Sequence, residues 1–173
     1  MHDPRYPIGR FERPALVDDA TRAQYVADLA AAPALLRAAV HGLDDARLDT
    51  PYRAGGWTVR QVVHHLADSQ VQAYVRTKLA LTEQEPQVKT WEEGLWAELA
   101  DVRGPVEPSL QMVEGAHARW VACLRALPAA AFARRVVHPV AGPLTVDQLL
   151  ALYAWHARHH TAHVTALRAA RGW

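Results

Sequence analysis

Apolar residues recur three and four positions apart along four long stretches of the chain, and this periodicity predicts four helices. Almost no stretch alternates polar and apolar residues as a half-buried strand would. The expected helices run from about Asp18 to His41, from the WTVRQ stretch to Leu81, from about Ser109 to Leu127, and from the LTVDQ stretch to Ala170. The expected fold class is therefore all-α.

Two of these helices begin with the same local signal. Thr58 is followed three residues later by Gln61, and Thr145 by Gln148. This is the spacing of a capping box, in which two side chains satisfy the free N–H groups of the first helical turn. Pro33 lies inside the first predicted helix, where it lacks an N–H, and it predicts either a kink or a split.

The second and third helices are joined by a long connection, residues 82–108, which exceeds the length of an ordinary turn. Part of it, near Glu92 to Leu99, is predicted to form a short helix. The connection carries Trp91 and Trp96, which could cover one end of the helical assembly.

Four histidines lie close together near the C-terminus, in the stretch WHARHHTAHV. At about 100° per residue, His160 lies about 40° from His156 and His163 about 20° on the other side, all within the apolar stripe of the last helix. His159 lies on the shoulder of this stripe, about 60° away. Three histidines of one helix are therefore predicted to point into the core.

The same test separates two adjacent histidines of the second helix. His65 borders the apolar stripe on the same side as Ser69, whereas His64 lies nearly opposite and is expected to be solvated. The third helix has one histidine, His117, on its apolar face. Asp68 points away from the stripe of its helix and is expected to cap or pair at the surface.

A single inward histidine is usually a hydrogen-bonded core residue, but several that converge are harder to satisfy. Each neutral ring needs partners for two nitrogens, and an unpaired buried nitrogen costs about 1–3 kcal/mol. A divalent cation satisfies several at once. His156 and His160 have the i, i+4 spacing of helical metal sites, and a third nitrogen from another helix would leave a coordination position open for catalysis.

Composition narrows the class of protein. The chain has 173 residues and a mass of 19.2 kDa, and half of its residues are hydrophobic, which predicts a single globular domain over 1–173. The formal net charge of +1 gives no reason to expect nucleic-acid binding, and no stretch is apolar enough for a membrane span. The N-terminus lacks an apolar signal-peptide core, so the expected location is cytoplasmic. Cys123 is the only cysteine, which excludes an internal disulfide.

Three motifs resemble a known family: RYPIGRFE, YRAGGWTVRQVVHHLADSQVQAY and YAWHARHHTAHV. They are similar to the YfiT-like branch of the DinB superfamily, and the similarity spans nearly the whole chain. The resemblance implies a four-helix bundle, with a long connection between helices two and three and a three-histidine site for zinc or nickel. It assigns His65, His156 and His160 as ligands, and it also implies a homodimer. Ala54 stands where that family has proline.

The resemblance implies two reactions, metal-dependent hydrolysis and transfer of a low-molecular-weight thiol, bacillithiol or mycothiol, to a small electrophile. Of these two reactions we expect thiol transfer, because a thiol becomes a thiolate beside a divalent metal at neutral pH. Hydrolysis by metal-activated water is the alternative, although no glutamate stands beside the ligands as a general base. A third hypothesis is a non-catalytic metal-binding protein, closed by His163 or His117 as fourth ligand.

Other residues receive secondary roles in these schemes. His163 and His159 are candidate catalytic residues, as outer-shell partners of the metal or as proton carriers. Ser69, Arg76 and His117 are candidates for substrate binding. Arg76, on the same side of its helix as Ser69, could pair with a cosubstrate carboxylate, or it could be an ordinary exposed charge.

Overall fold

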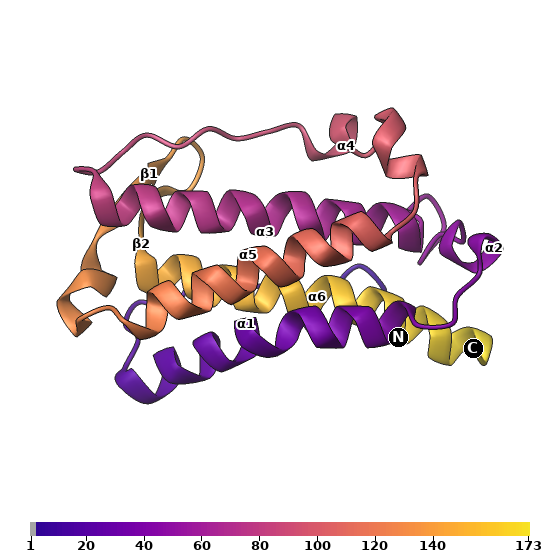
Figure 1. Cartoon of the computed structure of the whole chain (residues 1–173), viewed down its shortest axis with the longest axis horizontal. Helices are drawn as coiled ribbons and strands as arrows, with labels where there is room; N and C mark the ends of the chain where they lie inside the picture. Colours follow the sequence, from indigo (N-terminus) through magenta and orange to yellow (C-terminus); the bar gives the residue numbers. More distant parts are fainter. Residues whose placement is uncertain (1–2) are drawn as a thin grey trace.

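Residues 3–173 are described by a computed structural model in which four long helices form a bundle (Figure 1). The long helices are α1 (Asp19–Val40), α3 (Val59–Thr82), α5 (Glu107–Arg125) and α6 (Val146–Arg171). The shorter elements are α2 (Asp45–Leu48), α4 (Glu93–Trp96), β1 (Arg135–His138), β2 (Gly142–Thr145) and the 3-10 turns at Ala100–Arg103 and Ala129–Ala133. The all-α class and the four predicted helices are confirmed. No helix among residues 3–173 is both long and apolar enough to cross a membrane.

Both predicted capping boxes are present. The Thr58 hydroxyl accepts from the backbone N–H of Gln61, whose side chain accepts from the backbone N–H of Thr58. Thr145 and Gln148 exchange the same two bonds at the start of α6. These bonds fix where α3 and α6 begin, and so fix the faces that these helices turn to the core.

Pro33 does not split α1, which runs continuously from Asp19 to Val40. A proline at this position leaves the carbonyl four residues earlier, that of Leu29, without its helical donor. The Nδ1 of His117 on α5 lies 2.6 Å from that carbonyl oxygen. The buried His117 ring therefore donates the hydrogen bond that Pro33 cannot.

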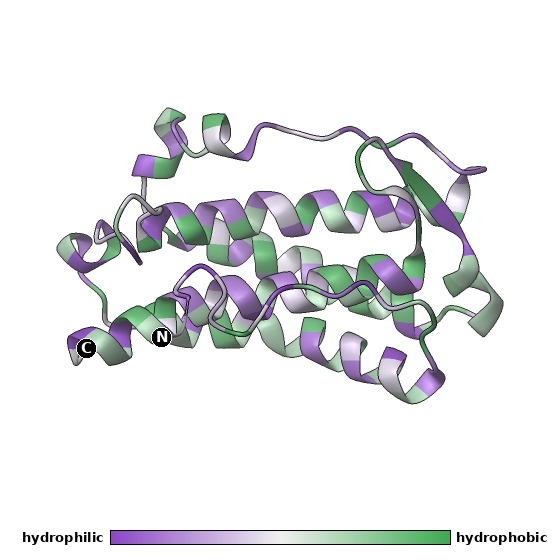
Figure 2. Ribbon diagram, turned by 180° about the vertical axis from the view of Figure 1, so that it is seen from behind, coloured by the Kyte–Doolittle hydropathy of each residue, from purple (hydrophilic) through white to green (hydrophobic). Residues whose placement is uncertain are grey.

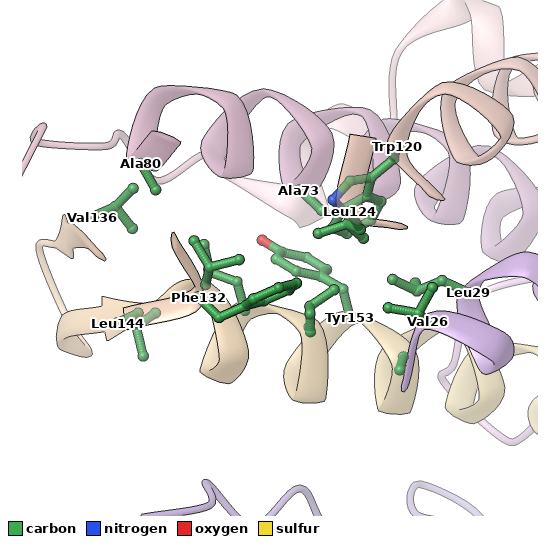
Figure 3. Close-up of a cluster of buried hydrophobic side chains, with 14 of the residues drawn as sticks. Val26, Leu29, Ala73, Ala80, Trp120, Leu124, Phe132, Val136, Leu144 and Tyr153 are labelled. Carbon is green, nitrogen blue, oxygen red and sulfur yellow. The ribbon is translucent and has the colours of Figure 1, made fainter. Parts of the chain in front are cut away.

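Two apolar clusters fill the bundle and meet near the middle of α6. The cluster toward the hairpin end includes Leu29, Trp120 and Tyr153, and Figure 3 shows Tyr153 reaching from α6 with its hydroxyl toward α3. The other includes Leu36, Val63 and Leu167. Along the ribbon, polar and apolar residues alternate with the helical turns, as expected for helices with one buried face (Figure 2).

The β-hairpin formed by β1 and β2 was not predicted. Its register pairs Arg135 with Thr145 and His138 with Gly142. The long connection also pairs with it, because the N–H of Val88 donates to the carbonyl of Val137 and the N–H of Val137 to that of Pro86. The connection is thereby held along the outer side of α3 rather than over one end of the bundle (Figure 1). The predicted short helix in it is confirmed as α4.

Candidate metal centre

Three imidazole nitrogens meet in the space between α3 and α6. His65 comes from α3, and His156 and His160 lie one turn apart on α6. The Nε2 of His156 lies 3.3 Å from that of His65 and 3.1 Å from that of His160. The donor nitrogens of all three lie within 4.8 Å of one another. Among the residues that the structure describes, no cysteine or carboxylate joins this group.

This spacing fits one shared cation better than hydrogen bonds between the rings. A neutral imidazole has a single lone pair, so the Nε2 of His156 cannot serve two neighbouring nitrogens as acceptor. Nitrogens bound at 2.0–2.1 Å to a tetrahedral zinc are about 3.3 Å apart, and octahedral sites bring them slightly closer. The observed separations of 3.1 and 3.3 Å match such an edge. His65, His156 and His160 could therefore hold a divalent metal and leave coordination positions open.

Burial keeps these rings in the form that a metal requires. Burial lowers the pKa of His65 to about 4. It also lowers the pKa values of His156 and His160 well below their usual value, and the neighbouring histidines add to this effect. A neutral ring offers its Nε2 lone pair at ordinary pH, so no proton must leave before a cation binds.

Two tryptophans form an aromatic wall beside His65. The ring centroid of Trp57 lies 4.6 Å from that of His65, and Trp91 stacks on the same imidazole at 5.6 Å. Trp96 contacts Trp91 edge to face at 4.5 Å. The helix pattern did not identify Trp57 as a site residue, although it stands directly before the capping residue of the helix that carries His65. These rings make the surroundings of the metal centre apolar on this side.

His159 and His163 lie beside the centre but outside the group that could share an ion. Their ring centroids are 5.1 and 5.3 Å from that of His160. His159 stacks on Trp155 at 4.3 Å, whereas His163 stacks on Tyr52 at 4.0 Å and donates from Nε2 to the carbonyl of Arg5 at 3.2 Å. The Nε2 of His163 is therefore occupied by a hydrogen bond to the N-terminal segment, which argues against its role as a fourth ligand.

His117, predicted as a substrate-binding residue or a fourth ligand, is a core residue. Only 1% of it is exposed, and its ring nitrogens face the Leu29 carbonyl and, at 3.1 Å, Oε1 of Gln70. Burial lowers its pKa, so the ring is neutral and carries one N–H, which the 2.6 Å contact assigns to the Nδ1 that faces Leu29. Nε2 is then an acceptor, and it pairs with Gln70 when the amide turns its NH2 group toward the ring. Both alternative roles are excluded by these contacts, because neither ring nitrogen points to the metal centre.

His117 donates to the Leu29 carbonyl that Pro33 leaves without a helical donor. Substitutions at positions 117 and 33 should therefore have non-additive effects on stability. Replacing His117 by leucine should lower the free energy of unfolding by about 1–3 kcal/mol, because the Leu29 carbonyl becomes unpaired in the core. In a Pro33→Ala background the backbone of residue 33 supplies the donor, and the same substitution should cost clearly less. Urea unfolding of the four proteins measures this cycle. Equal costs in both backgrounds would contradict the account.

His64 was expected to be solvated, and this prediction is wrong. The side chain is buried, and its Nδ1 lies 2.7 Å from the hydroxyl of Ser109 at the start of α5. Asp68 was expected to pair at the surface, but no ion pair or hydrogen bond of it is found within residues 3–173, and it is half-buried. Burial raises its pKa to about 6. In both cases the long connection and the start of α5 cover a face of α3 that a helical projection leaves open.

Arg76 is not an exposed charge. It is buried, with 7% exposure, and its Nη1 donates to the Tyr153 hydroxyl at 2.7 Å. Its Nη2 donates to the carbonyl of Lys89 in the long connection at 2.6 Å. Ser69, one turn beyond His65, is also buried. Arg76 therefore ties α3 to α6 and to the segment that carries Trp91.

Comparison with known proteins places these observations in a wider group. The sequence model of the DinB superfamily matches residues 28–164. A protein of Geobacillus thermodenitrificans, named "Putative metal-dependent hydrolase", is 49% identical over 98% of this chain and 96% of its own length. A Bacillus mycoides protein of the same description is 44% identical over both full lengths. YfiT from Bacillus subtilis, described as a "probable metal-dependent hydrolase" with an unusual four-helix bundle topology, superposes with a TM-score of 0.95 at 42% identity and covers 98% of each chain.

Proposed function

Since this chain belongs to the DinB superfamily, we propose that it is a metal-dependent enzyme whose three histidines hold one divalent cation, zinc or nickel, for transfer of a small thiol to an electrophile. The observation that carries the proposal is the convergence of three neutral Nε2 atoms from two helices without a fourth side-chain ligand among the described residues. Such a donor set leaves room for an exogenous ligand.

The cation would supply one effect, a lower pKa of a thiol held beside it, so that the thiolate forms at neutral pH. His65, His156 and His160 would hold the cation between α3 and α6. Trp57 and Trp91 exclude water from that side and offer an apolar surface to an organic electrophile.

The transfer is a substitution at carbon, in which sulfur replaces the leaving group. The S–H proton passes to His159 or to solvent, and the sulfur electron pair forms a new S–C bond. The bond from that carbon to its leaving group breaks, and a halide or alkoxide departs with the electron pair. His159 could relay this proton to solvent, because its ring is 5.1 Å from that of His160 and forms no hydrogen bond with another described residue. Burial and the neighbouring His163 lower the pKa of His159 to about 4, so the ring passes the proton on and does not keep it.

Hydrolysis is the second candidate, and the descriptions of the relatives support it. In this scheme the cation would activate water in place of a thiol. Hydrolytic metal sites commonly use a carboxylate as base, and no carboxylate belongs to the cluster formed by the described residues. The lack of an adjacent base weighs less for a thiol, whose ordinary pKa of about 8.5 is already close to neutrality.

A thiol panel separates the two reactions. The protein, loaded with zinc or nickel, is incubated with bacillithiol, mycothiol or glutathione and the electrophile monochlorobimane, and adduct fluorescence is followed. The expected result is an adduct rate that needs both a thiol and the metal, and that disappears after chelation. Turnover of a nitrophenyl ester by the metal-loaded protein, with no adduct from any of the three thiols, would reverse the assignment in favour of hydrolysis.

A further inference from the structure

A cavity of about 350 Å³ lies beside the metal centre, where α6, the loop before α3 and the N-terminal segment meet. Its lining residues are Arg5, Tyr6, Tyr52, Arg53, Gly55, Gly56, Trp57, His159, His160 and His163. His160 belongs both to this lining and to the three metal-binding histidines. A molecule in the cavity would therefore have one end close to the metal.

Among the residues that the structure describes, two arginines are the charged side chains of this lining, and no carboxylate belongs to it. Arg53 donates from Nε to the Tyr52 hydroxyl at 3.2 Å and from Nη1 to the carbonyl of Ala54 at 3.0 Å. No carboxylate among residues 3–173 is in ion-pair contact with it. Arg5 forms a bidentate pair with Asp3 through Nε and Nη2, so its charge is already offset by a carboxylate. Arg53, which no described carboxylate pairs, therefore leaves the cavity with a net positive charge.

The surrounding chain holds Arg53 in its position. Tyr52 is stacked on the buried ring of His163 at 4.0 Å, which anchors the loop to α6. Gly55 has a φ of +65°, a conformation that favours glycine. A Cβ at Gly56 would lie 2.7 Å from Cγ of Arg53, so only glycine leaves room for this arginine. The N-terminal segment closes the other side through the bond from His163 to the Arg5 carbonyl.

We propose that this cavity binds the carboxylate-bearing end of the substrate, with the guanidinium of Arg53 as its principal anchor. A planar guanidinium with unused donors matches a carboxylate in geometry and charge. The cavity volume of about 350 Å³ suits part of a small metabolite, with Tyr6 and Trp57 as apolar walls. This inference rests on the proposed function in one respect, that the other end of the substrate is a thiol held near the metal beside His160.

Glutathione and its diethyl ester test the proposal, because they share one thiol and differ in the charge of their carboxyl groups. With the metal-loaded protein and monochlorobimane, we expect the ester to show a KM about tenfold higher. Arg53→Gln should raise the KM for glutathione by a similar factor, leave that for the ester unchanged, and alter kcat little. Arg125→Gln is the matched control, since it removes the same charge from an exposed position at the end of α5. Equal KM values for both thiols in the unmodified protein would overturn the proposal.

Binding of S-methylglutathione, which has both carboxylates but no free thiol, separates the cavity from the reaction. Isothermal titration calorimetry should show affinity that falls about tenfold in Arg53→Gln, falls with added salt, and persists in Arg125→Gln. Gly56→Ala should also weaken binding, because it displaces Arg53 without removing its charge. Binding that depends on Arg53 without thiol turnover would support the cavity and contradict the transferase. Thiol turnover with binding indifferent to Arg53 would support the transferase and contradict the cavity.

Discussion

Replacing His156 by alanine should abolish stoichiometric metal binding and reduce activity by more than about 100-fold. The Nε2 of His156 lies within 3.3 Å of both other donor nitrogens. Its loss leaves only His65 and His160, which are too few ligands to hold the cation. Loss of an outer partner of a metal ligand typically costs 10–100-fold, and loss of a ligand itself should exceed this range. Metal content by inductively coupled plasma mass spectrometry and the bimane adduct rate measure the two effects.

His159→Ala is the matched control for metal content. It removes a buried imidazole from the same helix, and its ring is stacked on Trp155 rather than turned to the other three nitrogens. We expect one metal ion per chain in this variant. If His156→Ala retains one ion per chain, or if His159→Ala loses it to the same degree, the ligand assignment is wrong.

Replacing Arg76 by leucine should lower the free energy of unfolding by about 3 kcal/mol. The guanidinium is buried and satisfies two partners from separate elements, the Tyr153 hydroxyl on α6 and the carbonyl of Lys89 in the long connection. Hydrogen bonds to charged groups contribute about 1.5–3 kcal/mol each, and part of this is recovered by burying the leucine. Because Lys89 stands two residues before Trp91, the aromatic wall beside His65 should loosen as well.

Urea unfolding of the metal-free protein measures this cost without a contribution from bound metal. Arg76→Lys should recover only part of the stability, because an ammonium group cannot span both partners as a planar guanidinium does. Arg125→Leu, on the exposed end of α5, should change stability by less than about 0.5 kcal/mol. An Arg76→Leu protein as stable as its parent would show that this buried charge does not tie the connection to the bundle.

Local sequence signals sufficed for the helices and for the direction of the histidines. The pairs Thr58 with Gln61 and Thr145 with Gln148 mark helix starts because each pair acts within one turn and needs no distant partner. The periodicity of α6 likewise places His156 and His160 on the buried face. The convergence of these two with His65 required only that two apolar faces meet across the bundle.

Errors arose where a segment remote in sequence covers a face. His64 was expected in solvent, but the start of α5 brings the Ser109 hydroxyl to its ring. Arg76 was expected either to pair with a cosubstrate carboxylate or to be an exposed charge, but the long connection lies over it and offers the Lys89 carbonyl. The hairpin was not predicted because each of its strands has only four residues, and one of them also forms a hydrogen bond with the remote Val88. A helical projection shows directions but not the segments that cover them.

Three imidazole nitrogens from two helices are proposed to bind one divalent cation that keeps room for an exogenous ligand. X-ray absorption spectroscopy of the zinc- or nickel-loaded protein measures this coordination directly, before and after addition of a thiol. We predict three imidazole nitrogens with the remaining positions filled by solvent oxygen, and one of these replaced by sulfur when the thiol is added. A first shell with four protein ligands, or one without three imidazoles, would contradict the account.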